Sequence, residues 1–284
     1  MQKKKKKLLW LFNFFSENNT IDQLSGDWRI NCDTAGDNIW KILYILNNRM
    51  NTIKLSSRLR PACLQIIKKM NKIGILPNCT LQVDSFPSVI QCPLQMNMKT
   101  KKRFLLLDDM KEKLFLPKKP GRHGFKNQIC ITPYFGDIVD IETSFSPKAH
   151  DSHIFTISEI AKKIRKSERV AGDQPYRSNK NSFCHIGMEE HWKRQLFKKF
   201  RGLVERVIAM INKFNILSTP FRADLWKERF VIKVLADTTN IHILLNKPFH
   251  NRFCLMDHLK YYDYLEEKKK KDEKNKNSNT IKLY

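Results

Sequence analysis

Hydrophobic residues recur at helical spacing along residues 8–60. Two polar stretches, "SENNT" and "GDWRINCDTAGDN", interrupt this pattern and divide it into three segments. The pattern therefore predicts three short helices separated by polar turns. Such an arrangement is compatible with a helix-turn-helix whose second unit closes around Ile39–Leu46, and it fits a plain helical support region equally well.

Short β-prone runs replace the helical pattern after "ILPNC". Four strands are predicted, at 79–90, 127–135, 137–145 and 169–176. A helix is predicted over 153–166, between the last two strands, and a longer one over 192–214. The longer helix carries an apolar stripe made of Phe200, Leu203, Val204, Val207, Ile211 and Phe214. This order of elements predicts an α/β domain built in layers.

The chain is expected to have three parts. Residues 1–75 form the helical region, 76–250 form the α/β domain, and 251–284 form a helical end with a basic tail. Residues 266–284, "EEKKKKDEKNKNSNTIKLY", are of low complexity and are predicted to be disordered. A basic insertion at 96–124 separates the first two strands.

Positive charge dominates the composition. The chain has 53 Lys and Arg residues against 28 Asp and Glu residues, a formal net charge of +25. A surface with this charge favours a polyanionic partner, and nucleic acid is the expected one because neutralised phosphates release their counterions. The alternative is an excess of lysine from an AT-rich genome, which the many Lys, Asn and Ile residues also suggest.

The cysteines argue against a disulfide framework. Seven are present, an odd number, and no two have the C-x-x-C spacing of a zinc site. We interpret most of them as reduced core residues of an intracellular protein.

The N-terminal run Lys3–Lys7 precedes an apolar stretch and so resembles the start of a signal peptide. Asn13 interrupts the apolar stretch early, and no cleavage site of the A-x-A kind follows. We interpret the run as a nuclear-type basic cluster, which predicts a location in the nucleus. No apolar stretch is long enough to span a bilayer, so no membrane partner is expected.

Four carboxylates fall where the predicted layout would bring side chains together: Asp84 in the first strand, Asp151 after the third, Asp173 at the end of the fourth, and Glu205 beside the stripe of the long helix. Clustered carboxylates repel one another unless a cation lies between them, and Mg²⁺ prefers such oxygen ligands. Two such ions about 3.5–4 Å apart would suit phosphodiester chemistry. Each acid taken alone also fits a surface or turn role, which is what we expect of Asp137 and Asp140.

These stretches together resemble the PIF/Harbinger-type DDE transposases. The family's V-D-G-T-x-x-x-I strand corresponds to "VDSFPSVI" from Val83, and its P-G-S-x-H-D-S-x-x-F segment to "SPKAHDSHIF" from Ser146. Its A-D-x-G-Y corresponds to "GDQPY" from Gly172, and its R-x-x-V-E helix to "RGLVE" from Arg201. The match runs in order over roughly 80–250, and the N-terminal helices take the place of the family's helix-turn-helix.

The resemblance implies an RNase H-like mixed sheet flanked by helices, preceded by a small helical region. It also implies that Asp84, Asp173 and Glu205 form a metal-binding triad, with Asp151 as the fourth acid. The implied cofactor is Mg²⁺ or Mn²⁺, as two ions.

Three further residues are candidates for contact with substrate. Arg201 lies one helical turn before Glu205, so it either contacts phosphate or pairs with Glu205. Lys213 lies close to where the family has a lysine after the helix glutamate. His150 precedes Asp151 and either contacts substrate or is an exposed residue at the start of a helix.

The leading hypothesis is a transposon-derived, metal-dependent DNA endonuclease and strand transferase. The alternative is a domesticated or decayed transposase-like protein that binds DNA without cutting it. An RNA-binding protein fits less well, because the sequence has no aromatic pattern of an RRM and no GxxG loop of a KH domain. DNA is the expected partner, and the sequence leaves open a separate DNA-binding protein and self-association.

Overall fold

The computed structural model forms two compact units, Met1–Leu245 and Asn246–Tyr284. The structure describes residues 2–17, 19–72, 78–90, 94–96, 103–105, 124–176, 179, 182–183, 191–221, 223–247, 249 and 267. The predicted disordered tail lies outside the described residues except at position 267, and most of the basic insertion lies outside them as well. The site discussed below belongs to the first unit. The predicted division of the chain into three parts stays a prediction.

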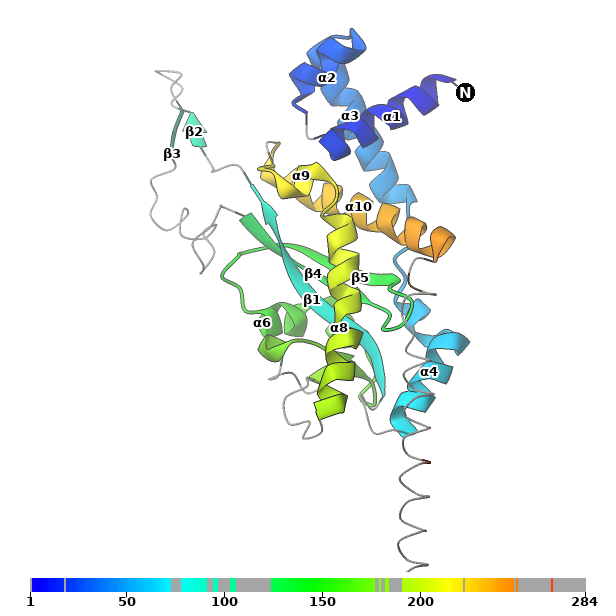
Figure 1. Cartoon of the computed structure of the whole chain (residues 1–284). Helices are drawn as coiled ribbons and strands as arrows, with labels where there is room; N and C mark the ends of the chain where they lie inside the picture. Colours follow the sequence, from blue (N-terminus) through cyan, green and yellow to red (C-terminus); the bar gives the residue numbers. More distant parts are fainter. Residues whose placement is uncertain are drawn as a thin grey trace, which may run out of the picture. The chain divides into compact units, whose positions relative to one another are not determined.

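Three helices open the chain, as the pattern predicts. They are α1 (Gln2–Glu17), α2 (Ile21–Trp28) and α3 (Cys32–Arg49) (Figure 1). The polar breaks act as helix caps: the Thr20 side chain accepts a hydrogen bond from the Gln23 amide, and the Asn31 side chain accepts one from the Asp33 amide. A helical N-terminal region is therefore confirmed, whereas its likeness to a helix-turn-helix stays a prediction.

A single mixed sheet follows the short helices η1 (Leu55–Leu59) and α4 (Pro61–Lys72). Its strands are β1 (Cys79–Val89), β4 (Gly124–Ile131), β5 (Ile138–Phe145), β6 (Arg169–Ala171) and β7 (Ser182–Phe183). Among the described residues the strand order is β5-β4-β1-β6-β7. The pairs β5·β4 and β4·β1 are antiparallel, and the pairs β1·β6 and β6·β7 are parallel. The predicted fold class, an RNase H-like mixed sheet flanked by helices, is confirmed.

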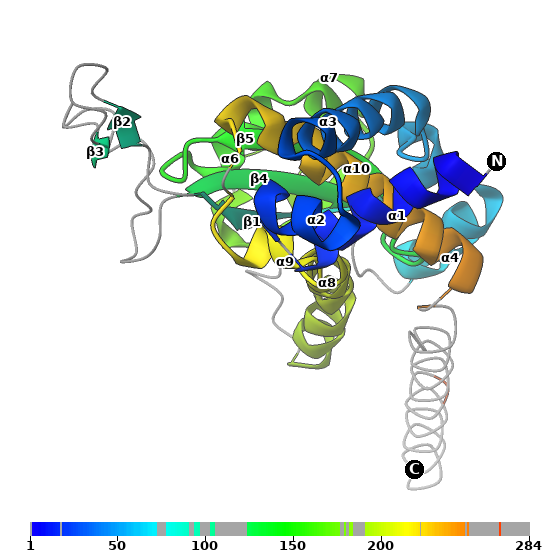
Figure 2. The same ribbon diagram turned by 90° about the horizontal axis from the view of Figure 1, so that it is seen from above.

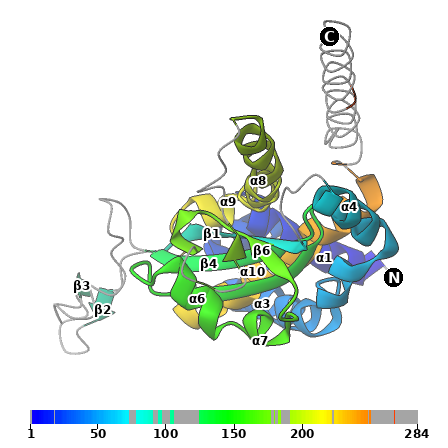
Figure 3. The same cartoon turned by 90° about the horizontal axis from the view of Figure 1, so that it is seen from below.

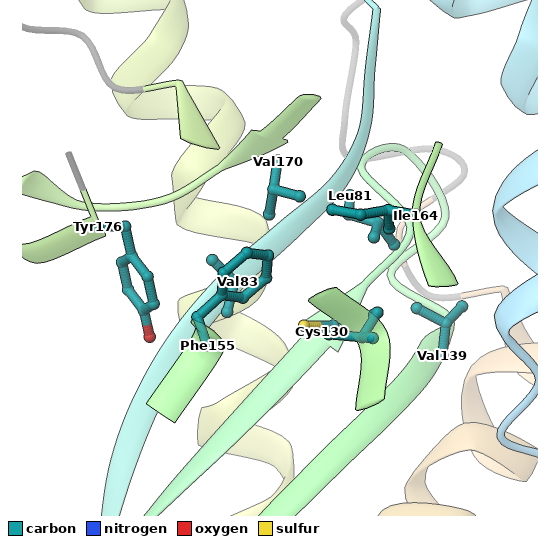
Figure 4. Close-up of a cluster of buried hydrophobic side chains, with 9 residues drawn as sticks. Leu81, Val83, Cys130, Val139, Phe155, Ile164, Val170 and Tyr176 are labelled. Atoms are coloured by element: carbon teal, nitrogen blue, oxygen red, sulfur yellow. The ribbon is translucent and has the colours of Figure 1, made fainter. Parts of the chain in front are cut away.

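The sheet lies between two helical layers. One face is covered by α8 (His191–Ile211) and the other by α6 (Asp151–Ile157) and α7 (Glu159–Lys163), as the view from below shows (Figure 3). The apolar stripe of α8 is buried from Phe200 to Ile211. On the opposite face, a second cluster is built from strand, α6 and α7 side chains (Figure 4). Its buried members are Leu81, Val83, Cys130, Val139, Phe155, Ile160, Ile164, Val170 and Tyr176.

Several predicted boundaries differ from the structure. The helix predicted over 153–166 is two helices, because Ser158 ends α6 and its hydroxyl caps the start of α7. The helix predicted over 192–214 ends at Ile211, and Phe214 instead precedes α9 (Asn215–Ser218). The predicted fourth strand stops at Ala171. The short hairpin of β2 (Leu94–Met96) and β3 (Arg103–Leu105) was not predicted.

The last helix of the unit, α10 (Leu225–Asn246), lies close to the N-terminal helices and β5 (Figure 2). Asp237 accepts hydrogen bonds from the Thr52 amide at 3.0 Å and its hydroxyl at 2.6 Å. Asn240 links the same loop to β5, since it donates to the Thr52 carbonyl and accepts from the Ile138 amide. The N-terminal region is thus joined to the sheet through α10.

The described cysteines have no disulfide partner. Cys63, Cys79 and Cys130 are buried and free, and Cys32 is free and half-buried. The reduced state predicted for most of the cysteines stays a prediction. None of the helices in the described part of the chain has the length and hydropathy to cross a membrane.

Candidate active site

The alternation of β1 sends its side chains to two different helical layers. Gln82 donates to the carbonyl of Phe200 on α8 at 3.0 Å, and Asp84 accepts from Arg201 on the same helix. Ser85, one residue later, donates to Asp151 of α6 at 2.7 Å. Successive side chains of a strand point to opposite faces, so Asp84 and Asp151 are engaged on different sides of the sheet.

Asp173 lies two residues beyond β6, which runs parallel to β1. Its main-chain carbonyl accepts from the amide of Tyr176 at 2.9 Å, and its carboxylate accepts from the amide of Gln174 at 2.8 Å. A Cβ at position 172 would lie 2.8 Å from the Tyr176 ring, so glycine is needed there. The "GDQPY" segment is therefore a tight turn that holds Asp173 just past the strand, rather than the continuing strand that was predicted.

Arg201 joins the two strand acids. Its Nη2 lies 3.0 Å from Oδ2 of Asp84, and its Nη1 lies 3.0 Å from Oδ1 of Asp173. The arginine side chain is only 13% exposed, while those of Asp84 and Asp173 are 20% and 44% exposed. The structure thus brings Asp84 and Asp173 together around one cation.

Glu205 lies one turn beyond Arg201 on α8, with an exposed side chain. Its charge acts on Asp84. Burial raises the pKa of Asp84, and the negative charges of Asp173 and Glu205 raise it further. Arg201 and the Ser85 amide lower this pKa without cancelling the rise. By formal charge, two carboxylates and the nearby Glu205 face one guanidinium.

Asp151 belongs to a different polar cluster. Its carboxylate accepts from Ser85 and lies 3.3 Å from Nζ of Lys126, which also donates to the Ala149 carbonyl at 2.8 Å. Among the described residues, Asp151 forms no ion pair with Arg201. Its role as a metal ligand stays a prediction, and its contact with Ser85 suits a residue that supports the middle of β1 beside Asp84.

The remaining candidates lie apart from the bridge. His150 is the N-cap of α6, and its Nδ1 accepts from the Ser152 amide at 3.3 Å. Lys213 is exposed just past the end of α8. The substrate roles predicted for both residues stay predictions.

Two acids expected to be plain turn or surface residues have buried carboxylate oxygens. Asp137 does occupy a turn, but it is buried and pairs with Arg60 at 2.6 Å. Asp140 has a buried Oδ2 with no hydrogen-bond partner. Burial, followed by the charge of Glu142, raises the pKa of Asp140 to about 7. The alternation of side chains along β5 could have predicted that Asp140 faces the inside of the fold. No local feature of the sequence predicts that its carboxylate lacks a hydrogen-bond partner.

The carboxylate oxygens at this site are the type of ligand that a hard divalent cation prefers, and their negative charge favours such an ion. Asp84, on β1, and Asp173, just past β6, supply carboxylate oxygens and already share one positive group. Within the described ranges, no three His, Cys, Asp or Glu side chains are close enough together to hold a metal ion. The bridge thus provides two ligands, and Glu205 is the nearest further acid on α8.

Comparison with known proteins defines the class. Residues 88–245, more than half of the 284-residue chain, match the family described as "DDE superfamily endonuclease". The chain belongs to this family. The matched range contains Asp173, Arg201 and Glu205 and begins four residues after Asp84.

Other comparisons add little. The crystal structure of a pre-cleavage Mos1 transpososome aligns over 79% of this chain and 74% of that chain, at 8% identity and a TM-score of 0.21. A likeness this slight carries no argument about the fold, which the strand order defines by itself. No curated protein matches the chain.

Proposed function

We propose that the protein is a metal-dependent DNA endonuclease and strand transferase of the PIF/Harbinger type. The observation that carries the proposal is the bridge of Arg201 between Asp84 and Asp173. An acid on β1 and an acid in the turn just past the neighbouring strand β6 meet a helix arginine, with Glu205 one turn further on. This arrangement suits a family whose members are endonucleases.

Asp84, Asp173 and Glu205 would hold the divalent ions, which we propose to be two Mg²⁺ or Mn²⁺. Such ions, when bound, activate a nucleophile and stabilise the leaving oxygen of a phosphodiester. Tyr176 and Gly172 hold the turn that fixes Asp173. A carboxylate fixed in this way is ordered before the substrate arrives.

Arg201 has two successive partners in this proposal. Its guanidinium pairs with Asp84 and Asp173. If those acids held divalent cations, the guanidinium would be free to bind a phosphate of the substrate, because a planar guanidinium binds phosphate oxygens in pairs. This retains the phosphate role predicted for Arg201 and gives it acid partners other than Glu205.

DNA is the proposed substrate because the chain carries a net charge of +25 around this acidic centre. The proposed location is the nucleus. A separate DNA-binding protein and a second copy of the chain are compatible partners.

The test is cleavage of a labelled DNA duplex with Mg²⁺, with Mn²⁺ and with EDTA. Wild type should cut only with metal. Glu205→Gln keeps the size of the side chain and removes its charge, so cleavage should fall about a thousandfold while DNA affinity stays unchanged. The matched control is Glu159→Gln on α7, another exposed helix glutamate, which should cleave like wild type.

The alternative is a transposase-like protein that has kept DNA binding and lost cleavage. It predicts that wild type binds DNA with a steep salt dependence and cuts it with neither metal. Wild-type-like cleavage by Glu205→Gln would instead remove Glu205 from the site.

A further inference from the structure

A small pocket lies between α3, α10 and the edge strand β5. Its volume is about 190 Å³, and its lining residues are Asn47, Ile141, Thr143, Arg229, Phe230 and Lys233. Pockets for drug-sized ligands measure about 300–1,000 Å³, so this one suits a single ring system or one anionic group. The site described above uses none of these residues.

Strand register places the pocket on the same face of the sheet as Asp84. Asp84 pairs with Ile129 of β4, and Ile129 pairs with Ile141 of β5. Paired residues on adjacent strands point to the same side of a sheet. The backbone at Ile141 is therefore two strands from Asp84, about 10 Å at the usual strand spacing.

The cations at the pocket are available to a ligand. Arg229 and Lys233 are exposed, are separated by one turn of α10, and form no ion pair with any acid that the structure describes. The guanidinium of Arg229 lies 4.9 Å from the centre of the Phe230 ring, which orients it beside an aromatic surface. This combination of cations and an aromatic ring suits a nucleotide, whose phosphate is anionic and whose base stacks on aromatic rings.

Asn47 supplies the second, independent observation. The residue is only 9% exposed, it lines the pocket, and its buried Oδ1 has no hydrogen-bond partner. A buried acceptor without a partner is costly, so a rotation of this side chain that brings Oδ1 to a ligand donor in the pocket would be stabilising. The amide and imino N–H groups on the edges of bases are such donors.

We propose that this pocket binds one unstacked nucleotide of a nucleic-acid strand. The base lies against Phe230 with its edge toward Asn47 and Thr143, and Arg229 and Lys233 hold the adjacent phosphates. The inference rests on the proposed function in taking nucleic acid as the partner. It adds a second, non-catalytic contact that requires a single-stranded or locally opened substrate.

The test measures binding of two labelled probes to the full chain by fluorescence anisotropy, in EDTA so that no cleavage occurs. One probe is an oligothymidylate of about twelve nucleotides, and the other is an abasic strand of the same length. The abasic strand keeps the phosphates and lacks the bases. Comparing the probes separates contacts to bases from contacts to phosphates.

The double variant Arg229→Gln/Lys233→Gln should weaken binding of both probes about tenfold. It should also reduce the slope of log affinity against log salt by about 1.4, since each phosphate contact on a single strand contributes about 0.7. The matched control is Lys68→Gln/Lys72→Gln on α4, an exposed pair with the same spacing and the same change in charge. The control should weaken binding less than about threefold.

Phe230→Leu should weaken binding of oligothymidylate about tenfold and leave the abasic strand unaffected. Circular dichroism shows whether this variant folds. If it does not, Thr143→Val keeps the shape of the strand residue and removes its hydroxyl, and about a fivefold loss on oligothymidylate alone is expected.

Equal losses of affinity in the two double variants would contradict nucleotide binding at the pocket, because Arg229 and Lys233 would then act only through the net charge of the protein. Equal losses on the two probes with Phe230→Leu, or with Thr143→Val in its place, would overturn the base contact. Both results leave the proposed function standing. Failure of wild type to bind any DNA, duplex included, would instead contradict the proposed function itself.

Discussion

Two arginines in this fold bind carboxylates in opposite ways. Arg58 meets Glu168 through two bonds, Nε at 2.7 Å and Nη2 at 2.9 Å, with both side chains 6% exposed. Glu168 also accepts from Thr80 and from the Arg165 amide. Burial would raise the pKa of Glu168, but these hydrogen bonds outweigh it and lower the pKa.

Arg201 instead divides one guanidinium between Asp84 and Asp173. Burial raises the pKa of Asp84, and here the arginine does not outweigh it. The Arg58 pair is complete in itself and has a structural role. The Arg201 bridge sets one guanidinium against two carboxylates, so its formal charge is negative, which favours a divalent cation. The difference distinguishes a structural ion pair from a candidate catalytic site of similar chemistry.

The largest expected effect is on the structural pair. Arg58→Met leaves Glu168 buried without its cation, so the free energy of unfolding should fall by about 3–5 kcal/mol. Urea denaturation at neutral pH measures it. A loss below about 1 kcal/mol would mean that the Arg58–Glu168 pair contributes no more to stability than the Arg201 bridge does.

Asp140 is a third kind of carboxylate in this fold, because it forms no ion pair with any Lys or Arg that the structure describes. Its pKa is raised to about 7, so the folded state holds a proton that the unfolded state releases near pH 4. Its contribution to stability therefore falls as pH rises from about 4 to about 7 and is constant above that range. Asp140→Asn should raise stability at pH 8 by about 2–4 kcal/mol and change it little at pH 4.

Denaturation of both proteins across this pH range provides the measurement. Groups that do not interact with Asp140 titrate identically in the two proteins, so the difference between them reports on Asp140 and on the charges that act on it, above all Glu142. A difference that does not vary with pH would contradict a raised pKa at Asp140.

Gly172→Ala should disturb the turn that holds Asp173. The added methyl group would lie 2.8 Å from the buried Tyr176 ring, so the cost should be about 1–3 kcal/mol. Gly202→Ala on α8 is the matched control, since its Cβ meets nothing within 4 Å. The control should stabilise the helix by about 0.5–1 kcal/mol. Thermal unfolding of both variants tests this, and equal effects would exclude the Tyr176 contact as the cause.

The smallest expected effect on stability is at the bridge. Arg201→Gln breaks two ion pairs whose acids are 20% and 44% exposed and can therefore be hydrated, and it breaks no further buried hydrogen bond that the structure describes, so it should cost about 1 kcal/mol. The measurement is urea denaturation beside Arg58→Met. A cost as large as that of Arg58→Met would make Arg201 a structural residue.

Local sequence predicted the layers of the fold and the acids to examine. The order of β-prone and helical segments predicted a layered α/β domain, the resemblance to PIF/Harbinger-type transposases implied the mixed sheet, and the motif order selected Asp84, Asp173 and Glu205. The partners of Arg201 could not be predicted in this way. Helical spacing offered only Glu205. The partners Asp84, on β1, and Asp173, just past β6, are 117 and 28 residues away in sequence and are brought close by the parallel pairing of β1 and β6.

Burial was the other property that local sequence did not reveal. Asp137 sits in a turn, as expected, but the turn is covered and pairs with Arg60. The end of β6 was also misplaced, because "RVAGDQPY" has β-prone residues but Gly172 and Tyr176 close a turn there.

Affinity for Mn²⁺, measured by electron paramagnetic resonance on the protein without DNA, tests the central claim most directly. If Arg201 occupies the cation position between Asp84 and Asp173, Arg201→Gln should bind Mn²⁺ about tenfold more tightly than wild type, because a competing positive charge is gone. Asp173→Asn should bind it at least about tenfold more weakly. Equal affinities in the three proteins would contradict the account, because Asp84 and Asp173 would then form only an ion pair with Arg201.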